Sequence, residues 1–226
     1  MQRNDESMQR ELTDYLAAFV SERRRGRMEE VLAQRTRFIA VLLEDLYQPH
    51  NASAVLRSCD CFGVQDVHIV EGRNAYRVNA DVDMGASGWL TMHRYGDMDA
   101  GLRALRQRGY RLVAATPHRD DCSLDDLPVD RPLAVLFGTE EAGLSDGALA
   151  AADEYVRVPM YGFSESFNIS VCAALILREL TGRLRAAGGD WGLSAEEKAA
   201  LRLEWYRRSV RGVAHVERRF MEARGA

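Results

Sequence analysis

The stretch FIAVLLEDLYQPHNASAVLRSCDCFGVQDVHIV, residues 38–70, decides the fold. Residues 38–45 form a short apolar run rich in strand-forming residues, and VHIV at 67–70 forms a second one. Between them, Asn51 is a suitable helix N-cap and Gly63 a suitable helix stop. A strand, a helix and a second strand in this order are typical of a parallel sheet.

The same alternation continues toward the C-terminus. Helices are predicted at 97–109 and 170–180, the second of them buried, and strands at 111–116, 130–138 and 155–160. Residues 37–190 are therefore predicted to form one α/β domain, with a mostly parallel sheet and helices on both faces.

Helical arms are predicted on both sides of this domain. Apolar residues at helical spacing within residues 8–36 indicate an N-terminal arm over 1–36. A long charged segment, 191–226, indicates a C-terminal arm. Its helix opens with Ser194 as the cap and Glu197 three residues later, which is the pattern of a capping box.

Composition narrows the class of protein. The chain has 226 residues, of which 46% are hydrophobic and 28% charged, which is typical of a globular protein. No apolar run approaches the roughly 18 residues that a membrane span needs, and the first ten residues are polar, so we expect a cytoplasmic protein without a membrane partner. The four cysteines form no paired CxxC motif, so we expect reduced thiols and no metal site.

Charge is distributed unevenly along the chain. The formal net charge of −4 argues against a nucleic-acid partner. Residues 198–224, however, contain eight basic and three acidic residues, a local charge of +5. Such a stripe could contact RNA phosphates, although a solvated helix surface in an arginine-rich protein is the alternative. The candidate RNA-binding residues are Arg23, Arg24, Arg25, Arg27, Arg207 and Arg208.

A first polar motif, PHNASAVLR, occupies residues 49–57 after the first strand. Ligands of parallel α/β sheets bind beyond the carboxyl ends of strands. Asn51 and Arg57 are six residues apart, which does not place them on one helix face. They can border one cleft if Asn51 caps the helix and Arg57 lies further along it. The alternative is an ordinary N-cap and a surface arginine.

A second motif, LFGTEEAGL, occupies residues 136–144, where an apolar strand runs into a loop with Glu140 and two glycines. Glycine lets the backbone approach a ligand closely. The lysine and the serine or threonine of a phosphate-binding loop are missing. Backbone groups here would suit an adenosine ligand, and a plain turn is the alternative.

A third motif, VPMYGFSESFNIS, occupies residues 158–170 before the predicted buried helix. Ser166, Asn168 and Ser170 are all candidate caps, although one cap suffices to start a helix. The surplus of short polar side chains beside Phe167 indicates ligand contacts, and capping alone is the alternative.

Taken in this order, the three motifs resemble those of the SpoU class of the SPOUT superfamily. The family patterns are N-x-x-A-x-x-R, G-x-E-x-x-G-L and P-M-x-G-x-x-x-S-L-N-x-S. Phe167 stands where leucine is usual, so the cofactor contact there is expected to persist with an altered shape. The resemblance covers about residues 25–190, and its most similar branch is the tRNA (guanosine-2'-O)-methyltransferase subfamily, TrmH.

The resemblance implies a trefoil-knotted domain that acts as a homodimer, takes S-adenosylmethionine as cofactor and methylates tRNA at the D-loop guanosine, position 18. It implies cofactor contacts at Thr116, Gly138, Val158, Ser166 and Phe167. It implies catalytic residues at Asn51, Arg57, Glu140 and Asn168.

In the implied reaction, a methyl group moves from a sulfonium to a ribose 2'-hydroxyl. Arg57 is either a base activated by an RNA phosphate or a permanent charge that stabilises the developing alkoxide. Asn51 would orient Arg57 or the ribose. Glu140 and Asn168 would shape the site, and Ser166 would support cofactor or substrate binding.

Three other functions are alternatives to this one. The first is 2'-O-methylation of rRNA or of another tRNA nucleotide, and the second is an RNA-binding module that has lost catalysis. The third, a dinucleotide-binding protein, is disfavoured because no GxGxxG follows the strand at 38–45.

Overall fold

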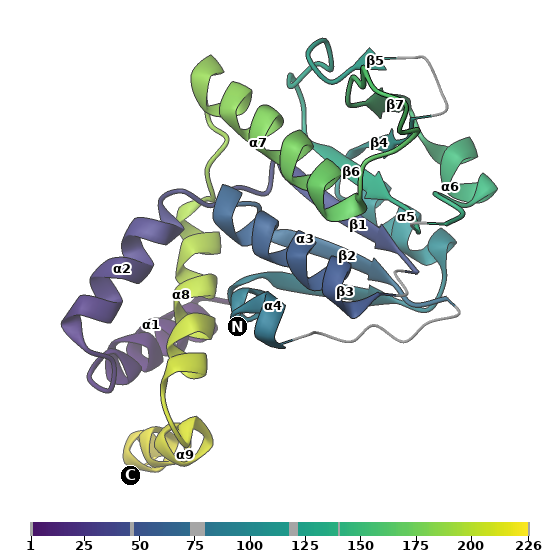
Figure 1. Ribbon diagram of the computed structural model, residues 1–226. Helices are drawn as coiled ribbons and strands as arrows, with labels where there is room; N and C mark the ends of the chain where they lie inside the picture. Colours follow the sequence, from purple (N-terminus) through teal and green to yellow (C-terminus); the bar gives the residue numbers. More distant parts are fainter. Residues whose placement is uncertain (1, 46–47, 73–79, 118–121, 140, 226) are drawn as a thin grey trace. The chain divides into compact units, whose positions relative to one another are not determined.

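The computed structural model describes residues 2–45, 48–72, 80–117, 122–139 and 141–225. The chain divides into two compact units. Residues 36–191 form the α/β unit. Residues 1–35 and 192–226 together form the helical unit (Figure 1).

The α/β unit is built on a seven-stranded sheet in the order β3-β2-β1-β6-β4-β7-β5. Within the described residues, neighbouring strands all pair in parallel. Val41 of β1, an interior strand, lies beside Val67 of β2 and Val135 of β6. The strands are β1 (Ile39–Glu44), β2 (Asp66–Val70), β3 (Thr91–Tyr95), β4 (Arg111–Ala115), β5 (Cys122–Ser123), β6 (Leu133–Phe137) and β7 (Glu154–Arg157).

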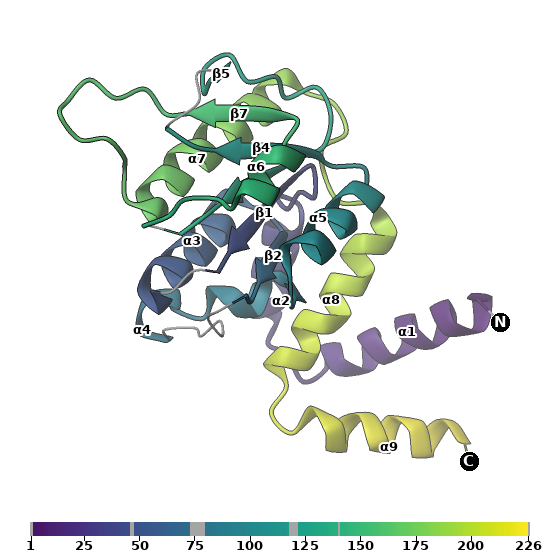
Figure 2. The same ribbon diagram turned by 90° about the vertical axis from the view of Figure 1, so that its right-hand side faces the viewer.

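Helices cover both faces of this sheet, as the sequence predicted (Figures 1 and 2). Helices α3 and α7 lie on one face, and α5 and α6 lie on the other. The helical segments are α3 (Pro49–Phe62), α4 (Ala80–Asp83), the 3-10 turn η1 (Ala86–Trp89), α5 (Met98–Gln107), α6 (Asp146–Ala151) and α7 (Ile169–Ala187).

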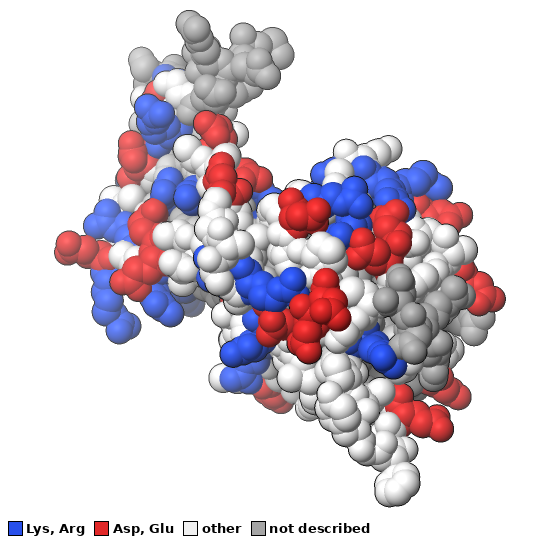
Figure 3. All heavy atoms as spheres, turned by 90° about the horizontal axis from the view of Figure 1, so that it is seen from above, with Lys and Arg blue, Asp and Glu red and all other residues white. Residues whose placement is uncertain are grey.

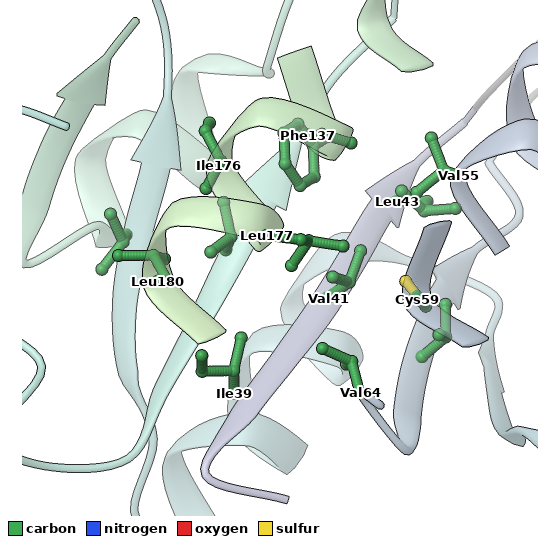
Figure 4. Packing of buried hydrophobic residues seen from close by; sticks show 14 of the residues in the cluster. Ile39, Val41, Leu43, Val55, Cys59, Val64, Phe137, Ile176, Leu177 and Leu180 are labelled. Atoms are coloured by element: carbon green, nitrogen blue, oxygen red, sulfur yellow. The ribbon is translucent and has the colours of Figure 1, made fainter. Parts of the chain in front are cut away.

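Strand β1 is buried along its whole length because its side chains alternate between two apolar layers. Ile39, Val41 and Leu43 point into the layer that α3 and α7 cover, where they meet residues such as Cys59 and Leu177 (Figure 4). Ala40 and Leu42 belong to the layer beneath α5 and α6. A strand buried on both faces reads as a continuous apolar run, which is the pattern seen at 38–45.

Helix α3 begins earlier than predicted, and the predicted N-cap is wrong. Pro49 lies at the first helical position, where its missing N–H costs nothing, and Gln48 is the capping residue. Asn51 therefore lies inside the first turn of the helix and does not cap it. The predicted stop is confirmed, because Gly63 adopts a left-handed φ of 80°.

Helix α7 is not buried on most faces, contrary to the prediction. Ile176 and Leu177 are fully buried, whereas Val171 is 46% and Leu175 39% exposed. The apolar pattern of residues 170–180 thus covers a core-facing side and a second, exposed side. Periodicity could not distinguish the two because both sides are apolar.

Strand β3 was not predicted from the sequence. Its residues, TMHRY, are largely polar and only partly buried. It is the edge strand next to β2, so it lacks the apolar run that marked the central strands.

The helical unit brings the two predicted arms together, and its helices are α1 (Gln2–Ala17), α2 (Glu22–Leu32), α8 (Ala195–Ser209) and α9 (Val213–Gly225). Helix α1 packs against α8 and α9, and α2 packs against α8. The Arg35 guanidinium lies 5.5 Å from the ring centre of buried Trp205. The predicted capping box at Ser194 and Glu197 is present.

None of the described helices is long and apolar enough to cross a bilayer.

Candidate active site

A pocket of about 430 Å³ opens at the carboxyl ends of β4, β6 and β7. Three segments line it: residues 115–117 at the end of β4, residues 137–144 (other than the undescribed residue 140) at the end of β6, and residues from the end of β7 to the start of α7. Ligands of parallel α/β sheets bind at this edge, and the volume is typical of a small-molecule site. The α/β unit therefore has a ligand-sized pocket where such folds place one.

The structure brings all five predicted cofactor residues into the lining of this pocket, although they come from three separate loops. They are Thr116, Gly138, Val158, Ser166 and Phe167. Their contacts with a cofactor stay a prediction.

Gly138 is needed for the shape of the pocket wall. A Cβ at this position would lie 2.1 Å from the carbonyl carbon and oxygen of Gly143 and 2.2 Å from the amide nitrogen of Leu144. Thr139 and Gly143 exchange two backbone hydrogen bonds of 2.9 and 3.0 Å, which fold the loop back on itself. We expected the glycine to admit a ligand, but the backbone that it admits belongs to its own loop.

Asn51 and Asn168 meet beside the pocket. The Asn168 Nδ2 donates to Asn51 Oδ1 at 3.3 Å, and the Asn51 Nδ2 donates to Gln48 Oε1 at 3.2 Å. The Asn168 Oδ1 accepts from both the backbone N–H and the hydroxyl of Ser170, at 2.9 and 2.6 Å. Asn168 thus caps α7, lines the pocket and contacts the first turn of α3.

Arg57 lies on α3 outside the pocket lining, with its side chain exposed. Six residues after Asn51, it has turned to another side of the helix. The ion pairs recorded among the described residues do not include its guanidinium, so this charge is open to an external phosphate or partner. The fourth predicted catalytic residue, Glu140, lies outside the described residues.

Sequence reasoning missed several charged and polar pocket residues. Glu141, Arg157 and Glu165 line the pocket, and only their places within or beside the motifs could have indicated this. Cys172 also lines it, and burial raises the pKa of its thiol to about 11. A neutral thiol therefore faces the pocket near neutral pH.

The predicted RNA-binding arginines all belong to the helical unit. Arg25 is half-buried, whereas the other five are exposed. Arg27 pairs with Glu30 at 3.0 Å, and Arg207 pairs with Glu217 at 2.7 Å. Acidic side chains therefore balance part of this basic surface. Figure 3 likewise shows basic and acidic side chains interspersed over much of one face of the molecule.

The parallel sheet and the pocket at its carboxyl edge define an α/β protein with a ligand-binding site. Residues 39–178 match the SpoU rRNA Methylase family. The chain therefore belongs to this methylase family, and the predicted membership is confirmed.

Known relatives agree with this assignment. The tRNA (guanosine(18)-2'-O)-methyltransferase of Borreliella burgdorferi is 38% identical over 202 residues, covering 89% of this chain and 93% of the relative. The Escherichia coli K12 protein of the same name is 34% identical, covering 73% and 72%.

Solved structures have the same fold. The TrmH/SpoU tRNA modifying enzyme of A. aeolicus matches with a TM-score of 0.76 and 27% identity, over 84% of this chain and 98% of that one. The SpoU methyltransferase AviRb of Streptomyces viridochromogenes, in complex with AdoMet, matches with a TM-score of 0.61 and 26% identity, over 70% and 65%. These matches confirm the predicted α/β fold with a parallel sheet.

Proposed function

We propose that this chain transfers a methyl group from S-adenosylmethionine to the ribose 2'-hydroxyl of guanosine 18 in the D loop of tRNA. The observation that carries the proposal is the convergence of the second and third motifs on one pocket, with Asn51 of the first motif hydrogen-bonded to the pocket residue Asn168. The names of the relatives from Borreliella burgdorferi and Escherichia coli support the choice of substrate.

The pocket fits S-adenosylmethionine in size and in chemistry. Phe137 and Val158 offer apolar surface for an adenine ring, and residues 138–139 and 141–144 offer backbone groups. Glu141 and Glu165 place negative charge at a site that would receive a positively charged sulfonium. When bound, the cofactor supplies the methyl group, and the protein positions it and the hydroxyl.

Asn51, Arg57 and Asn168 act on the side of the ribose. The Asn51–Asn168 bond fixes the first turn of α3 against the pocket. Arg57 is exposed to the outside and acts in one of two ways. Either it first loses its own proton beside an RNA phosphate and then accepts the hydroxyl proton, or it stays charged, holds the phosphate and stabilises the developing alkoxide. Glu140 would help to shape the site, and Ser166 would hold cofactor or substrate.

A second copy of this chain would complete the site. Tyr161 and Phe163 are fully exposed, and Phe167, Val171 and Leu175 are 39–46% exposed, so one apolar strip runs from the loop after β7 onto α7. Figure 2 shows this loop reaching away from the sheet before it returns to α7. A strip of this kind marks an interface, and a homodimer with a trefoil knot in each subunit, acting in the cytoplasm, fits the proposed activity.

The helical unit supplies affinity for tRNA. Exposed ion pairs such as Arg27–Glu30 contribute at most about 1 kcal/mol, so RNA phosphates can replace their carboxylates. Replacing Arg23, Arg24 and Arg27 with glutamine should weaken tRNA binding and flatten its dependence on salt. An unchanged salt slope would show that α2 does not contact RNA.

A methyl-transfer assay with labelled cofactor, an unmodified tRNA transcript and nucleoside mass mapping tests the proposed activity. Labelled 2'-O-methylguanosine in the D loop, lost in Arg57→Ala, is the expected result. Transfer to ribosomal RNA alone would show that the substrate is rRNA and not tRNA. The SpoU rRNA Methylase family description is compatible with that result. Cofactor binding without transfer to either RNA would favour the non-catalytic alternative.

A further inference from the structure

Glu44 is a buried carboxylate at the end of β1, outside the three motifs. It is the last residue of β1 and is 8% exposed. Its Oε2 accepts a hydrogen bond of 2.9 Å from the backbone N–H of Ser145, 101 residues along the chain. Ser145 is in turn the N-cap of α6, where its hydroxyl accepts from the Ala148 N–H.

This bond anchors one end of the pocket wall. Gly143 and Leu144, which both line the pocket, directly precede Ser145. The other end of the same loop continues from β6 at Gly138, and the Thr139–Gly143 bonds close it in between. Without the Glu44 carboxylate, the Ser145 N–H would lose its acceptor, and the end of the loop would lose its tie to the sheet.

We propose that Glu44 is a positioning residue for the cofactor, a role that rests on the pocket being the cofactor site. Glu44 is not among the pocket-lining residues, so it acts through Gly143 and Leu144. Its carboxylate holds these two residues where their backbone can contact the ligand. Without this bond, the loop would have to be ordered each time the cofactor binds, which costs binding free energy. Removing the Glu44 carboxylate should therefore lower cofactor affinity and leave the rate of the chemical step nearly unchanged.

The test compares Glu44→Ala, Glu44→Gln and a control variant in the full-length protein. The control is Asp153→Ala, because Asp153 also accepts a backbone N–H, from Leu112 at 2.7 Å, but at the start of β4, the end of the strand away from the pocket. Affinity for S-adenosylmethionine is measured by calorimetry, KM and kcat by methyl transfer to tRNA, and thermal stability by circular dichroism.

Glu44→Ala should weaken cofactor affinity and raise the cofactor KM about tenfold, with kcat at saturating cofactor nearly retained. Glu44→Gln should restore affinity because its amide oxygen can still accept the Ser145 N–H. Asp153→Ala should lose stability without losing affinity. Wild-type affinity in Glu44→Ala, or an equal loss in Asp153→Ala, would overturn the proposal.

Two further variants test the proposal if Glu44→Ala fails to fold and separate the role of Glu44 from the assignment of the pocket. If Glu44→Ala does not fold, Glu44→Asp shortens the side chain by one methylene and should also weaken cofactor binding; wild-type affinity in Glu44→Asp would overturn the role. Gly138→Ala tests the pocket itself. Normal affinity in Gly138→Ala would overturn the pocket assignment, whereas a loss in Gly138→Ala alone would overturn only the role of Glu44.

Discussion

The side-chain amide of Asn168 donates a hydrogen bond of 3.3 Å to the side-chain oxygen of Asn51, which joins the cap of α7 to the first turn of α3. The backbone N–H and the hydroxyl of Ser170 both donate to the side-chain oxygen of Asn168. The amide nitrogen of Asn168 is therefore the group that faces Asn51. The first and third motifs, far apart in sequence, are therefore held in one orientation.

Asn51 and Asn168 should act as a unit in catalysis. Asn51→Ala and Asn168→Ala should each lower kcat, and the double variant should lose less than the two losses combined, with a coupling of about 1 kcal/mol. Steady-state methyl transfer in a double-mutant cycle measures this coupling. Asn168→Asp is the matched control for folding, because its carboxylate keeps the oxygen that caps α7 and replaces the donor to Asn51 with a charged acceptor. Strict additivity would contradict the coupling.

Arg57→Ala should abolish most of the methyl-transfer activity without changing the affinity for the cofactor. The arginine lies outside the pocket lining, so cofactor affinity should stay at the wild-type value, while kcat should fall by a factor of roughly 10²–10³. Calorimetry and single-turnover methyl transfer separate the two effects. Arg103→Ala removes another exposed arginine, on α5, and should be neutral. Near-normal turnover in Arg57→Ala would remove Arg57 from the mechanism.

Gly138→Ala should disrupt the pocket wall. The added methyl group would meet the backbone of Gly143 and Leu144 at 2.1–2.2 Å, so the loop must move and cofactor binding should be lost. Gly147→Ala is the control, because this glycine on α6 has nothing within 4 Å of its added Cβ. It should be neutral or slightly stabilising, since alanine favours a helix by up to about 1 kcal/mol. Equal cofactor affinities in the two variants would show that the close approach at Gly138 is unimportant.

The apolar strip on α7 should be needed for association. Val171→Glu and Leu175→Glu put a charge on the exposed side of the helix and should convert a dimer into monomers, with little loss of stability. Sedimentation velocity measures the oligomeric state. Met84→Glu is the control, because Met84 is 70% exposed and lies outside the strip. A monomeric wild-type protein, or a dimer in both α7 variants, would contradict the proposed interface.

Much of the sheet was predictable because central parallel strands have a plain signature. Residues 38–45 formed a continuous apolar run, and β1 is buried on both faces. Strand β3 lacked that signature because an edge strand tolerates His93 and Arg94. Sequence patterns thus predicted the interior strands of the sheet and missed the edge strand β3.

The candidate site was only partly predictable. The residues of the second and third motifs could be placed on one sheet edge, since the carboxyl ends of parallel strands meet there. Asn51 was placed at the cap because asparagine favours that position, whereas Pro49 at the first helical position moves the cap three residues earlier, to Gln48. The Asn51–Asn168 hydrogen bond and the bond from the Ser145 N–H to Glu44 depend on how segments far apart in the sequence pack together. A local sequence pattern cannot predict such packing.

His68 is fully buried and lies in a polar cluster on β2 and β3. Its ring stacks on His93 at 4.5 Å, and its Nδ1 lies 2.9 Å from the Tyr95 hydroxyl. Burial, helped by the charges of His93 and Arg108 and opposed by Asp66, lowers the pKa of His68 to about 3. The folded protein therefore keeps this imidazole neutral well below its ordinary pKa of 6.5.

This lowered pKa should make the fold sensitive to mild acid. Below pH 6.5 the unfolded chain protonates His68 and the folded chain does not, so stability is full above that pH and is lost as the pH falls toward 3. Between about pH 6.5 and about pH 5 this one group should cost about 2 kcal/mol. His68→Gln can still bond to Tyr95 but cannot titrate, so its unfolding midpoint in urea should fall less over this range. The same decline in both proteins would mean that His68 is protonated in the folded state or that other groups dominate.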